Sequence, residues 1–134
     1  MTTKKFDLSD PVQYQKNNPF MDYCHIEIVS VSPECSKVRV EMTHELKNLN
    51  GTAHGGLLCT LADCVAGITA RADGRNYVTQ SAHINFIRNV TEGTLYAVGT
   101  PIKRGRHTVV IHVQILHASG TLLADASIDM FCLE

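Results

Sequence analysis

The sequence predicts an α+β fold in which one long helix packs against a six-stranded antiparallel sheet. Only residues 54–72 repeat their apolar positions with the period of a helix, whereas six other stretches alternate apolar and polar residues as β-strands do. Short turn-forming segments join the later strands, which favours antiparallel neighbours. A single helix among such strands is expected to bury its apolar side on one face of the sheet.

The composition is that of one ordinary folded domain. The chain has 134 residues, a net charge of −1, 44% hydrophobic and 19% charged residues, compared with roughly 25% charged residues in a typical soluble protein. This balance excludes a disordered or polybasic chain and gives no support for nucleic-acid binding. No stretch approaches the roughly 20 apolar residues of a membrane helix, and the polar start is unlike a signal peptide, so we expect a cytoplasmic protein without a membrane partner. The shortage of charge also indicates that some surface meets another subunit.

Residues 1–22 are expected to form an N-terminal segment, followed by a single domain over residues 23–134. Asp10 and Pro11 have the residue types of a helix cap and a first helical position, which predicts a short helix that ends near Pro19. Alternation then begins, with a turn at residues 33–34 between two predicted strands, Cys24–Val31 and Ser36–Thr43.

The predicted long helix has two unlike faces. Its apolar face falls within an arc of roughly 100° and consists of Leu57, Leu58, Leu61, Val65, Ile68 and Ala72. The opposite face carries small side chains and a single charge; its residues are Cys59, Thr60, Asp63, Ala66, Gly67 and Ala70. Because a helix face in water normally carries several charges, we expect a partner or a ligand to cover this one. The remaining predicted strands are Tyr77–Ile87, Leu95–Lys103, Thr108–His117 and Leu122–Cys132, with turns at residues 104–106 and 118–120.

The cysteines and histidines do not predict a metal site. The five cysteines, at positions 24, 35, 59, 64 and 132, lack CxxC spacing and are expected to be reduced thiols. Cys59 and Cys64 admit a role as metal ligands or as a nucleophile, but small core side chains are the favoured interpretation. Three histidines recur every fifth residue, at positions 107, 112 and 117, which on a strand places successive side chains on opposite faces.

The segment from Asn48 to Gly56 leads directly into the long helix and ends in His54-Gly55-Gly56. Backbone amides at a helix start lie at the positive end of the helix dipole and can polarise a carbonyl, although two glycines equally suit a tight turn into the helix without any such role.

Asp63 either attacks a carbonyl, deprotonates a water or is an ordinary exposed carboxylate. Eight residues, or about 12 Å, separate Gly55 from Asp63 along one helix. If both act on one carbonyl, two antiparallel helices must meet, which requires a dimer with two shared sites.

These residues resemble the hotdog-fold acyl-CoA thioesterases of the PaaI-like group, which includes phenylacetyl-CoA thioesterases. The resemblance covers residues 20–132 and is carried by Asn48, His54-Gly55-Gly56, Leu61-Ala62-Asp63, Val78-Thr79-Gln80-Ser81 and Asn85-Phe86. It implies that Asp63 is the catalytic carboxylate and that the Gly55 amide polarises the thioester carbonyl. It also implies that His54 and Asn48 shape the thioester end of the pocket and that Thr79 positions Asp63 or the water. Each of these residues also has a purely structural alternative. His54 would then support the loop, Asn48 would be an ordinary turn residue, and Thr79 would be an ordinary strand residue.

The same resemblance implies that a second set of residues contacts the substrate: Gly56, Ser81, Phe86, Arg88, Lys103, Arg104, Gly105, Arg106 and His107. Within this set, the basic turn at residues 103–107 is either a solvated hairpin or a site for the phosphates of coenzyme A. Coenzyme A would then be part of the substrate, and no separate cofactor is expected. The resemblance further implies homodimers that often pair again into tetramers.

Two other functions remain open. A hydratase or dehydratase on the same fold also uses a His and a helical carboxylate, although the nine-residue step from His54 to Asp63 favours hydrolysis. A non-catalytic acyl-CoA-binding protein is the other alternative. The acyl group is undecided between aryl-acetyl, hydroxybenzoyl and short or medium aliphatic groups, and no Lys or Arg can be assigned to the pocket end. We expect the pocket lining to come from the N-terminal segment and from Leu57, Leu61, Tyr77 and Phe86.

Overall fold

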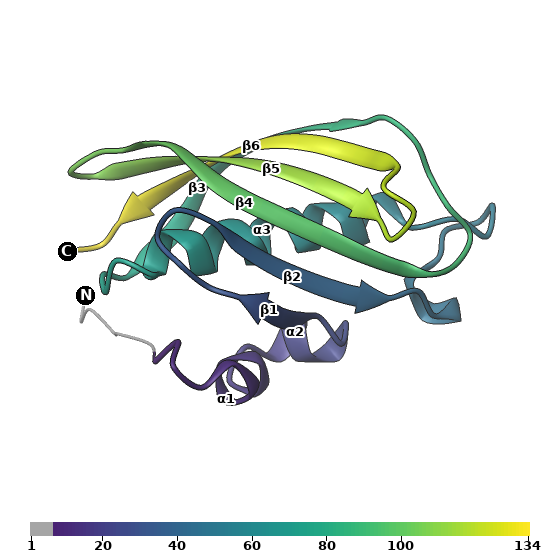
Figure 1. Cartoon of the computed structure of the whole chain (residues 1–134), viewed down its shortest axis with the longest axis horizontal. Helices are drawn as coiled ribbons and strands as arrows, with labels where there is room; N and C mark the ends of the chain where they lie inside the picture. The colour runs from purple at the N-terminus through teal and green to yellow at the C-terminus, as the bar shows by residue number, and fades with distance from the viewer. Residues whose placement is uncertain (1–6) are drawn as a thin grey trace.

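The computed structural model describes residues 7–134, so the first six residues of the expected N-terminal segment lie outside it. One antiparallel sheet of six strands, in the order β1-β2-β4-β5-β6-β3, carries the long helix α3 on one face (Figure 1). The helix spans Gly55–Arg71, and the strands are β1 (Glu27–Ser30), β2 (Ser36–Glu41), β3 (Tyr77–Phe86), β4 (Thr94–Arg104), β5 (Thr108–His117) and β6 (Leu122–Cys132). The predicted α+β architecture is confirmed.

The core lies between α3 and the sheet. Leu58, Leu61, Val65 and Ile68 are fully or almost fully buried on the helix, as the apolar arc predicts. They pack with buried side chains from the strands, including Val38, Leu95, Val113, Ile115 and Ile128. At Gly99 on β4 an added Cβ would lie 2.9 Å from Thr69 Oγ1, so the glycine permits a close approach of helix and sheet.

The N-terminal segment is more helical than expected. The predicted short helix is α1 (Pro11–Lys16), and the Asp10 carboxylate accepts a hydrogen bond from the Gln13 amide at 3.1 Å. A second helix, α2 (Pro19–Tyr23), was not expected, because Pro19 starts it at the first helical position instead of ending α1. The strand expected from Cys24 therefore begins only at Glu27: Cys24 caps α2, and His25 adopts a positive φ of 59°.

The small-residue face of α3 is only partly open. Cys59 and Asp63 are exposed, but Ala66, Gly67 and Ala70 are buried. Part of the cover is the chain's own N-terminal segment, since Arg71 on α3 donates a 3.0 Å hydrogen bond to the Tyr14 hydroxyl of α1. The chain itself therefore covers part of the C-terminal half of this face, and cover by a partner or a ligand over the exposed residues stays a prediction.

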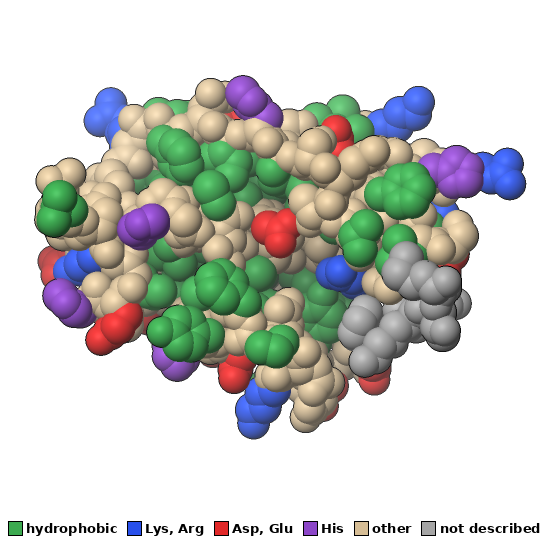
Figure 2. Space-filling view, turned by 180° about the vertical axis from the view of Figure 1, so that it is seen from behind, with side chains coloured by type: hydrophobic (Ala, Val, Ile, Leu, Met, Phe, Trp, Pro, Cys, Tyr) green, Lys and Arg blue, Asp and Glu red, His purple; other side chains and the backbone are tan. Residues whose placement is uncertain are grey.

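Strand β3 forms one edge of the sheet, and among residues 7–134 its one strand partner is β6. A bulge at Gln80 shifts the register, so Thr79 is opposite the buried Met130 whereas Ser81 is opposite Asp129. Beyond Tyr77 almost all of the strand is exposed, including Val78 and Phe86, which are 44% and 55% exposed. Figure 2 shows hydrophobic side chains gathered on the side of the molecule that carries α3, with few charges near its centre. A long unpaired edge beside such a surface is a ready site for pairing with another strand.

No helix within residues 7–134 has both the length and the apolar character needed to cross a membrane.

Candidate active site

The first turn of α3 leaves one backbone donor unpaired. His54 caps the helix: its Nδ1 accepts a 2.8 Å hydrogen bond from the Gly56 amide, and its carbonyl accepts from the amides of Leu57 and Leu58. Within residues 7–134 the Gly55 N–H has no acceptor. This amide therefore remains available at the positive end of the helix dipole.

The loop before α3 is held by two asparagines. Asn48 Oδ1 accepts hydrogen bonds from the Asn50 amide, the Thr52 amide and the Thr52 hydroxyl at 2.9 to 3.1 Å. Asn89 was not predicted from the sequence, and its side chain binds both backbone groups of Ala53. Its Oδ1 accepts a hydrogen bond from the Ala53 N–H, and its Nδ2 donates one to the Ala53 carbonyl. These contacts favour the structural interpretation of Asn48 as a residue that shapes the loop.

Asp63 and Thr79 meet between the helix and the edge strand. The Thr79 hydroxyl donates a short hydrogen bond to Asp63 Oδ1 and also lies 3.6 Å from the Met130 sulfur. Because Asp63 is exposed, the bond from Thr79 fixes the direction of a carboxylate that still has access to water. This contact agrees with the positioning role expected for Thr79.

Two separate hollows contain the catalytic candidates. The first, of about 390 Å³, contains Asp63 and Thr79; the second, of about 320 Å³, contains Gly55, Asn48 and Arg88 beside other residues of the α3 entrance. Eight helical residues separate Gly55 from Asp63, which corresponds to about 12 Å. One chain therefore does not bring the Gly55 amide and the Asp63 carboxylate to the same carbonyl.

The lining of the first hollow differs from the expected one. Leu57, Leu61 and Tyr77 are buried in the core, and Phe86 lines the second hollow. The first hollow is instead bounded by the N-terminal segment, as expected, and by the small-residue face of α3; its lining is Tyr14, Asn18, Phe20, Met21, Cys59, Thr60, Asp63, Cys64, Gly67, Arg71, Thr79 and Met130.

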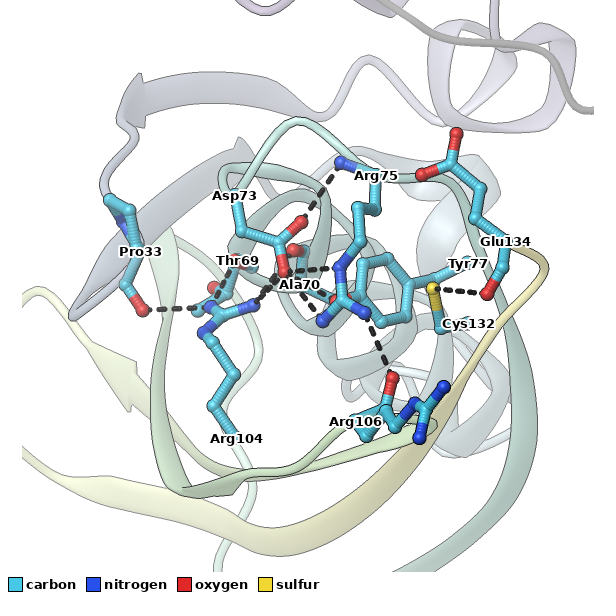
Figure 3. Close-up of polar contacts among 10 residues, drawn as sticks. All are labelled: Pro33, Thr69, Ala70, Asp73, Arg75, Tyr77, Arg104, Arg106, Cys132 and Glu134. Atoms are coloured by element: carbon cyan, nitrogen blue, oxygen red, sulfur yellow. Dashed lines mark hydrogen bonds and ion pairs between the residues drawn. The ribbon is translucent and has the colours of Figure 1, made fainter.

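The basic hairpin lies at the other end of α3 from Gly55. Arg104 donates to the Thr69 and Ala70 carbonyls at the end of the helix, to the Pro33 carbonyl and to Asp73 (Figure 3). These four contacts give Arg104 a structural role. The side chains of Lys103, Arg106 and His107 are exposed, and the Gly105 amide closes the turn onto the Thr108 carbonyl.

Ser81 does not join the Asp63 group. The bulge at Gln80 places Ser81 on the sheet face away from α3, where its hydroxyl donates a 2.8 Å hydrogen bond to Asp129.

Asp73 lies at the centre of a polar cluster that the sequence did not reveal. Its carboxylate accepts from the Tyr77 hydroxyl, from Arg75 and from Arg104 at 2.9 Å (Figure 3). Burial alone would raise the pKa of Asp73, but the hydrogen bonds from Tyr77 and Arg75 outweigh it and hold that pKa below its ordinary value. Burial and the same hydrogen bond raise the pKa of Tyr77 to about 12.

The cysteines divide by exposure. Cys24 and Cys132 are buried, as expected for core side chains, whereas Cys35 and Cys59 are exposed, so the core interpretation is wrong for Cys59. Burial raises the pKa of Cys64 to about 12, which keeps this thiol protonated and unreactive. Nowhere in residues 7–134 do three His, Cys, Asp or Glu side chains converge as a metal site would need.

Comparison with known proteins identifies relatives over most of the chain. Residues 50–124 match the family model described as Thioesterase superfamily. A Deinococcus radiodurans protein named "Putative esterase" is 30% identical over 113 residues, which cover 83% of this chain and 77% of that protein. A hypothetical thioesterase of Streptococcus pneumoniae, solved with coenzyme A, is 28% identical with a TM-score of 0.77, covering 81% of this chain and 88% of that one. The Haemophilus influenzae thioesterase HI1161, at 22% identity and a TM-score of 0.88, covers 98% of this chain and 93% of that one and shows the shared fold alone.

Proposed function

The chain belongs to the thioesterase superfamily, with the hotdog fold, and on that premise we propose that it hydrolyses a compact acyl-CoA to the free acid and coenzyme A. One observation carries the proposal. The unpaired Gly55 amide and the Thr79-held Asp63 carboxylate are the two groups that thioester hydrolysis needs, and they lie on one helix in two separate hollows. The PaaI-like subgroup stays a prediction.

The mechanism divides the chemistry between these two groups. The Gly55 N–H donates a hydrogen bond to the thioester oxygen and stabilises the negative charge that develops on it. Asp63 either removes a proton from the attacking water or attacks the carbonyl itself to form a transient anhydride that water then cleaves. The thiolate of coenzyme A leaves in both routes. Single turnover in ¹⁸O-labelled water distinguishes them, because only the anhydride route transfers label into the Asp63 carboxylate.

A two-fold dimer brings the separated groups together. Pairing of two β3 edges in antiparallel fashion places the two α3 helices side by side and antiparallel. If Gly55 of one subunit faces Asp63 of the other, the two-fold axis of the dimer passes beside the residue midway between positions 55 and 63 of each helix. That residue is Cys59, which is exposed on the same helix face. The 12 Å separation within one chain then becomes close contact across the interface.

The same arrangement gives the basic hairpin a place in coenzyme A binding. With the axis near Cys59, the C-terminal end of the partner helix extends about 12 Å beyond Gly55, since Arg71 lies eight residues beyond Asp63. The exposed Lys103, Arg106 and His107 of that partner are available for the phosphates of the substrate. The Streptococcus pneumoniae structure holds coenzyme A, and one from Streptococcus mutans, 29% identical, holds acetyl-CoA.

The geometry of His54 favours hydrolysis over hydration. A hydratase needs an imidazole nitrogen that can take a proton from the substrate. Nδ1 of His54 is engaged as the acceptor for the Gly56 amide, and in that tautomer Nε2 carries the ring hydrogen, so it faces a substrate as a hydrogen-bond donor. With crotonyl-CoA as substrate, we expect release of free thiol and no hydration of the double bond.

Complementation between two inactive variants tests the shared site. Asp63→Asn removes the carboxylate, and Gly55→Pro removes the amide at a first helical position where proline is well tolerated. A heterodimer of the two, isolated through two different affinity tags, contains one intact and one doubly defective site. We expect each parent to be inactive and the heterodimer to recover about half of the wild-type activity per dimer.

Gly55→Ala is the matched control, because it keeps the amide and its Cβ would lie 3.6 Å from the Phe86 ring, an ordinary contact. A folded heterodimer without activity would refute the shared site, and a fully active Asp63→Asn protein would refute the catalytic role of Asp63. Light scattering measures the mass of the assembly in solution, which should be twice the 14.7 kDa chain mass for a dimer and four times that mass for the predicted tetramer. The cytoplasmic location stays a prediction.

A further inference from the structure

One buried aromatic side chain of the N-terminal segment, that of Tyr14, lines the Asp63 hollow. Tyr14 is the single buried residue of helix α1, with 8% of its surface exposed. It belongs to the same core cluster as the apolar face of α3. The ring therefore fixes α1 to the rest of the domain and at the same time bounds the hollow that contains the candidate catalytic carboxylate.

The Tyr14 hydroxyl is held by Arg71, at the point where the hollow reaches the last turn of α3. Arg71 Nη1 donates to this hydroxyl at 3.0 Å. The other two guanidinium nitrogens donate to the Tyr77 carbonyl at 2.8 Å and to Asn76 Oδ1 at 3.3 Å. A Cβ built on Gly67 would lie 2.7 Å from Nη1, so the guanidinium extends back over the helix. Because these donors are engaged inside the chain, Arg71 is part of the wall of the hollow and not a ligand for the substrate.

A further hollow, of about 250 Å³, adjoins the Tyr14–Arg71 contact. We call it the α1–α2 hollow, because its lining adds Asn17, Asn18 and Pro19, from the connection between these helices, to Tyr14 and Arg71. Tyr14, Asn18 and Arg71 line both this hollow and the Asp63 hollow. Side chains that line two hollows form the wall between them, and here the Tyr14 ring is its large apolar component.

We infer that Tyr14 is a specificity-determining residue whose ring ends the acyl site and thereby limits the length of the acyl group. This inference rests on the proposed thioesterase function. Around Asp63 the hollow is lined mostly by uncharged side chains, among them Phe20, Met21 and Met130. An apolar acyl chain gains free energy by leaving water for such a lining, whereas the phosphates of coenzyme A need exposed cations. The acyl group then extends from Asp63 toward Tyr14.

Truncation of Tyr14 should lengthen the acyl site. Tyr14→Ala removes the ring and leaves a cavity that is bounded by core side chains and is continuous with the Asp63 hollow. An apolar cavity of this kind binds apolar molecules that match its size. A longer acyl chain should therefore occupy the space of the ring and, beyond it, enter the α1–α2 hollow.

A series of straight-chain esters, from acetyl-CoA to decanoyl-CoA, tests the inference through thiol release. In the wild-type enzyme kcat/KM should pass through a maximum and decline once the chain is long enough to meet Tyr14. Each methylene that moves from water into an apolar site increases kcat/KM by about fourfold. If two more methylenes find room in Tyr14→Ala, the ratio of kcat/KM for octanoyl-CoA to that for butyryl-CoA should rise by at least about tenfold.

Two control variants separate the ring from its surroundings. Tyr14→Phe keeps the ring and loses the hydroxyl that contacts Arg71, so it should keep the wild-type ratio. Val12→Ala shortens an apolar side chain of the same helix that is 62% exposed and lines neither hollow, so its ratio should also match wild type. A general loosening of α1 would lower the turnover of all esters alike and would leave the ratio in place.

Three results would overturn the inference: a wild-type kcat/KM that keeps rising up to decanoyl-CoA, a wild-type ratio in folded Tyr14→Ala, or an equally raised ratio in Tyr14→Phe. If Tyr14→Ala does not fold, Tyr14→Leu decides by the same ratio, because leucine keeps an apolar side chain in the core and is shorter than the ring. Each of these results leaves the thioesterase function intact. Absence of thiol release from every ester would instead refute the proposed function, and the inference with it.

Discussion

Replacing Arg104 by methionine should destabilise the fold and leave the chemistry nearly unchanged. Methionine keeps the unbranched apolar stem of arginine but removes the guanidinium. In the structure that guanidinium, on a side chain 24% exposed, donates to three backbone carbonyls and to Asp73. It connects the end of α3 to the turn between β1 and β2, so its loss affects two distant parts of the chain.

The magnitude follows from these contacts. Breaking a buried ion pair costs about 3 to 5 kcal/mol, and each hydrogen bond from a charged donor contributes about 1.5 to 3 kcal/mol. Asp73 retains Tyr77 and Arg75, and the helix-end carbonyls can recover water, so the lower end of this range applies. We expect a loss of about 3 kcal/mol, which in a chain of 134 residues lowers Tm by about 10 °C.

Urea unfolding at one fixed protein concentration measures this loss, with Lys103→Met as the matched control. Lys103 is the adjacent residue, is exposed and carries the same charge, so its replacement should change the free energy of unfolding by less than about 0.5 kcal/mol. If Arg104 instead served coenzyme A alone, Arg104→Met would raise KM for every acyl-CoA and leave the unfolding curve in place. That result would refute the structural role.

Three further predictions concern the site, the interface and the polar cluster. Thr79→Val should lower kcat about tenfold with a small change in KM, because Asp63 loses the hydrogen bond that orients it, and Thr79→Ser should restore the rate; equal rates for Val and Ser would contradict this. A short bismaleimide should join two chains through Cys59, and a Cys59→Ser protein that cross-links equally well would exclude the proposed axis. Tyr77 has its pKa raised from 10.0 to about 12, so its contribution to stability is complete below pH 10 and is lost as the pH rises toward 12. Between pH 10 and 12 the free energy of unfolding should therefore fall more steeply with pH for the wild type than for Tyr77→Phe. Identical slopes of this free energy against pH would count against the prediction.

Local patterns were sufficient to predict most of the fold. The apolar arc of α3 and its start at His54 could be read from the sequence, because burial against one sheet face imposes the helical period directly. The second helix could not be predicted, because a proline can either end a helix or begin one: the sequence pattern predicts that α1 ends near Pro19, whereas in the structure Pro19 begins α2. Only the packing of Met21 and Tyr14 into the core distinguishes the two.

The candidate site stays a prediction, but its residue types and spacing could be recognised where they lie on or next to one helix. Asp63 stood out as the one charge on a helix face of small residues, and the contact with Thr79 agrees with its expected role. Arg71 did not stand out, because a basic residue in the last turn of a helix is ordinary. Its place in the hollow depends on Gly67 and on the fold of α1, neither of which a linear pattern specifies.

The unbroken helix between Gly55 and Asp63 has a consequence for how the two shared sites of the proposed dimer would behave. A helix is stiff along its axis, so the spacing between its own amide and its own carboxylate is constant. If one antiparallel helix slid past the other by a single residue, about 1.5 Å, both sites would lose alignment by the same amount at the same moment. A sliding motion could therefore switch the enzyme on or off as a whole, but it could not favour one site over its twin.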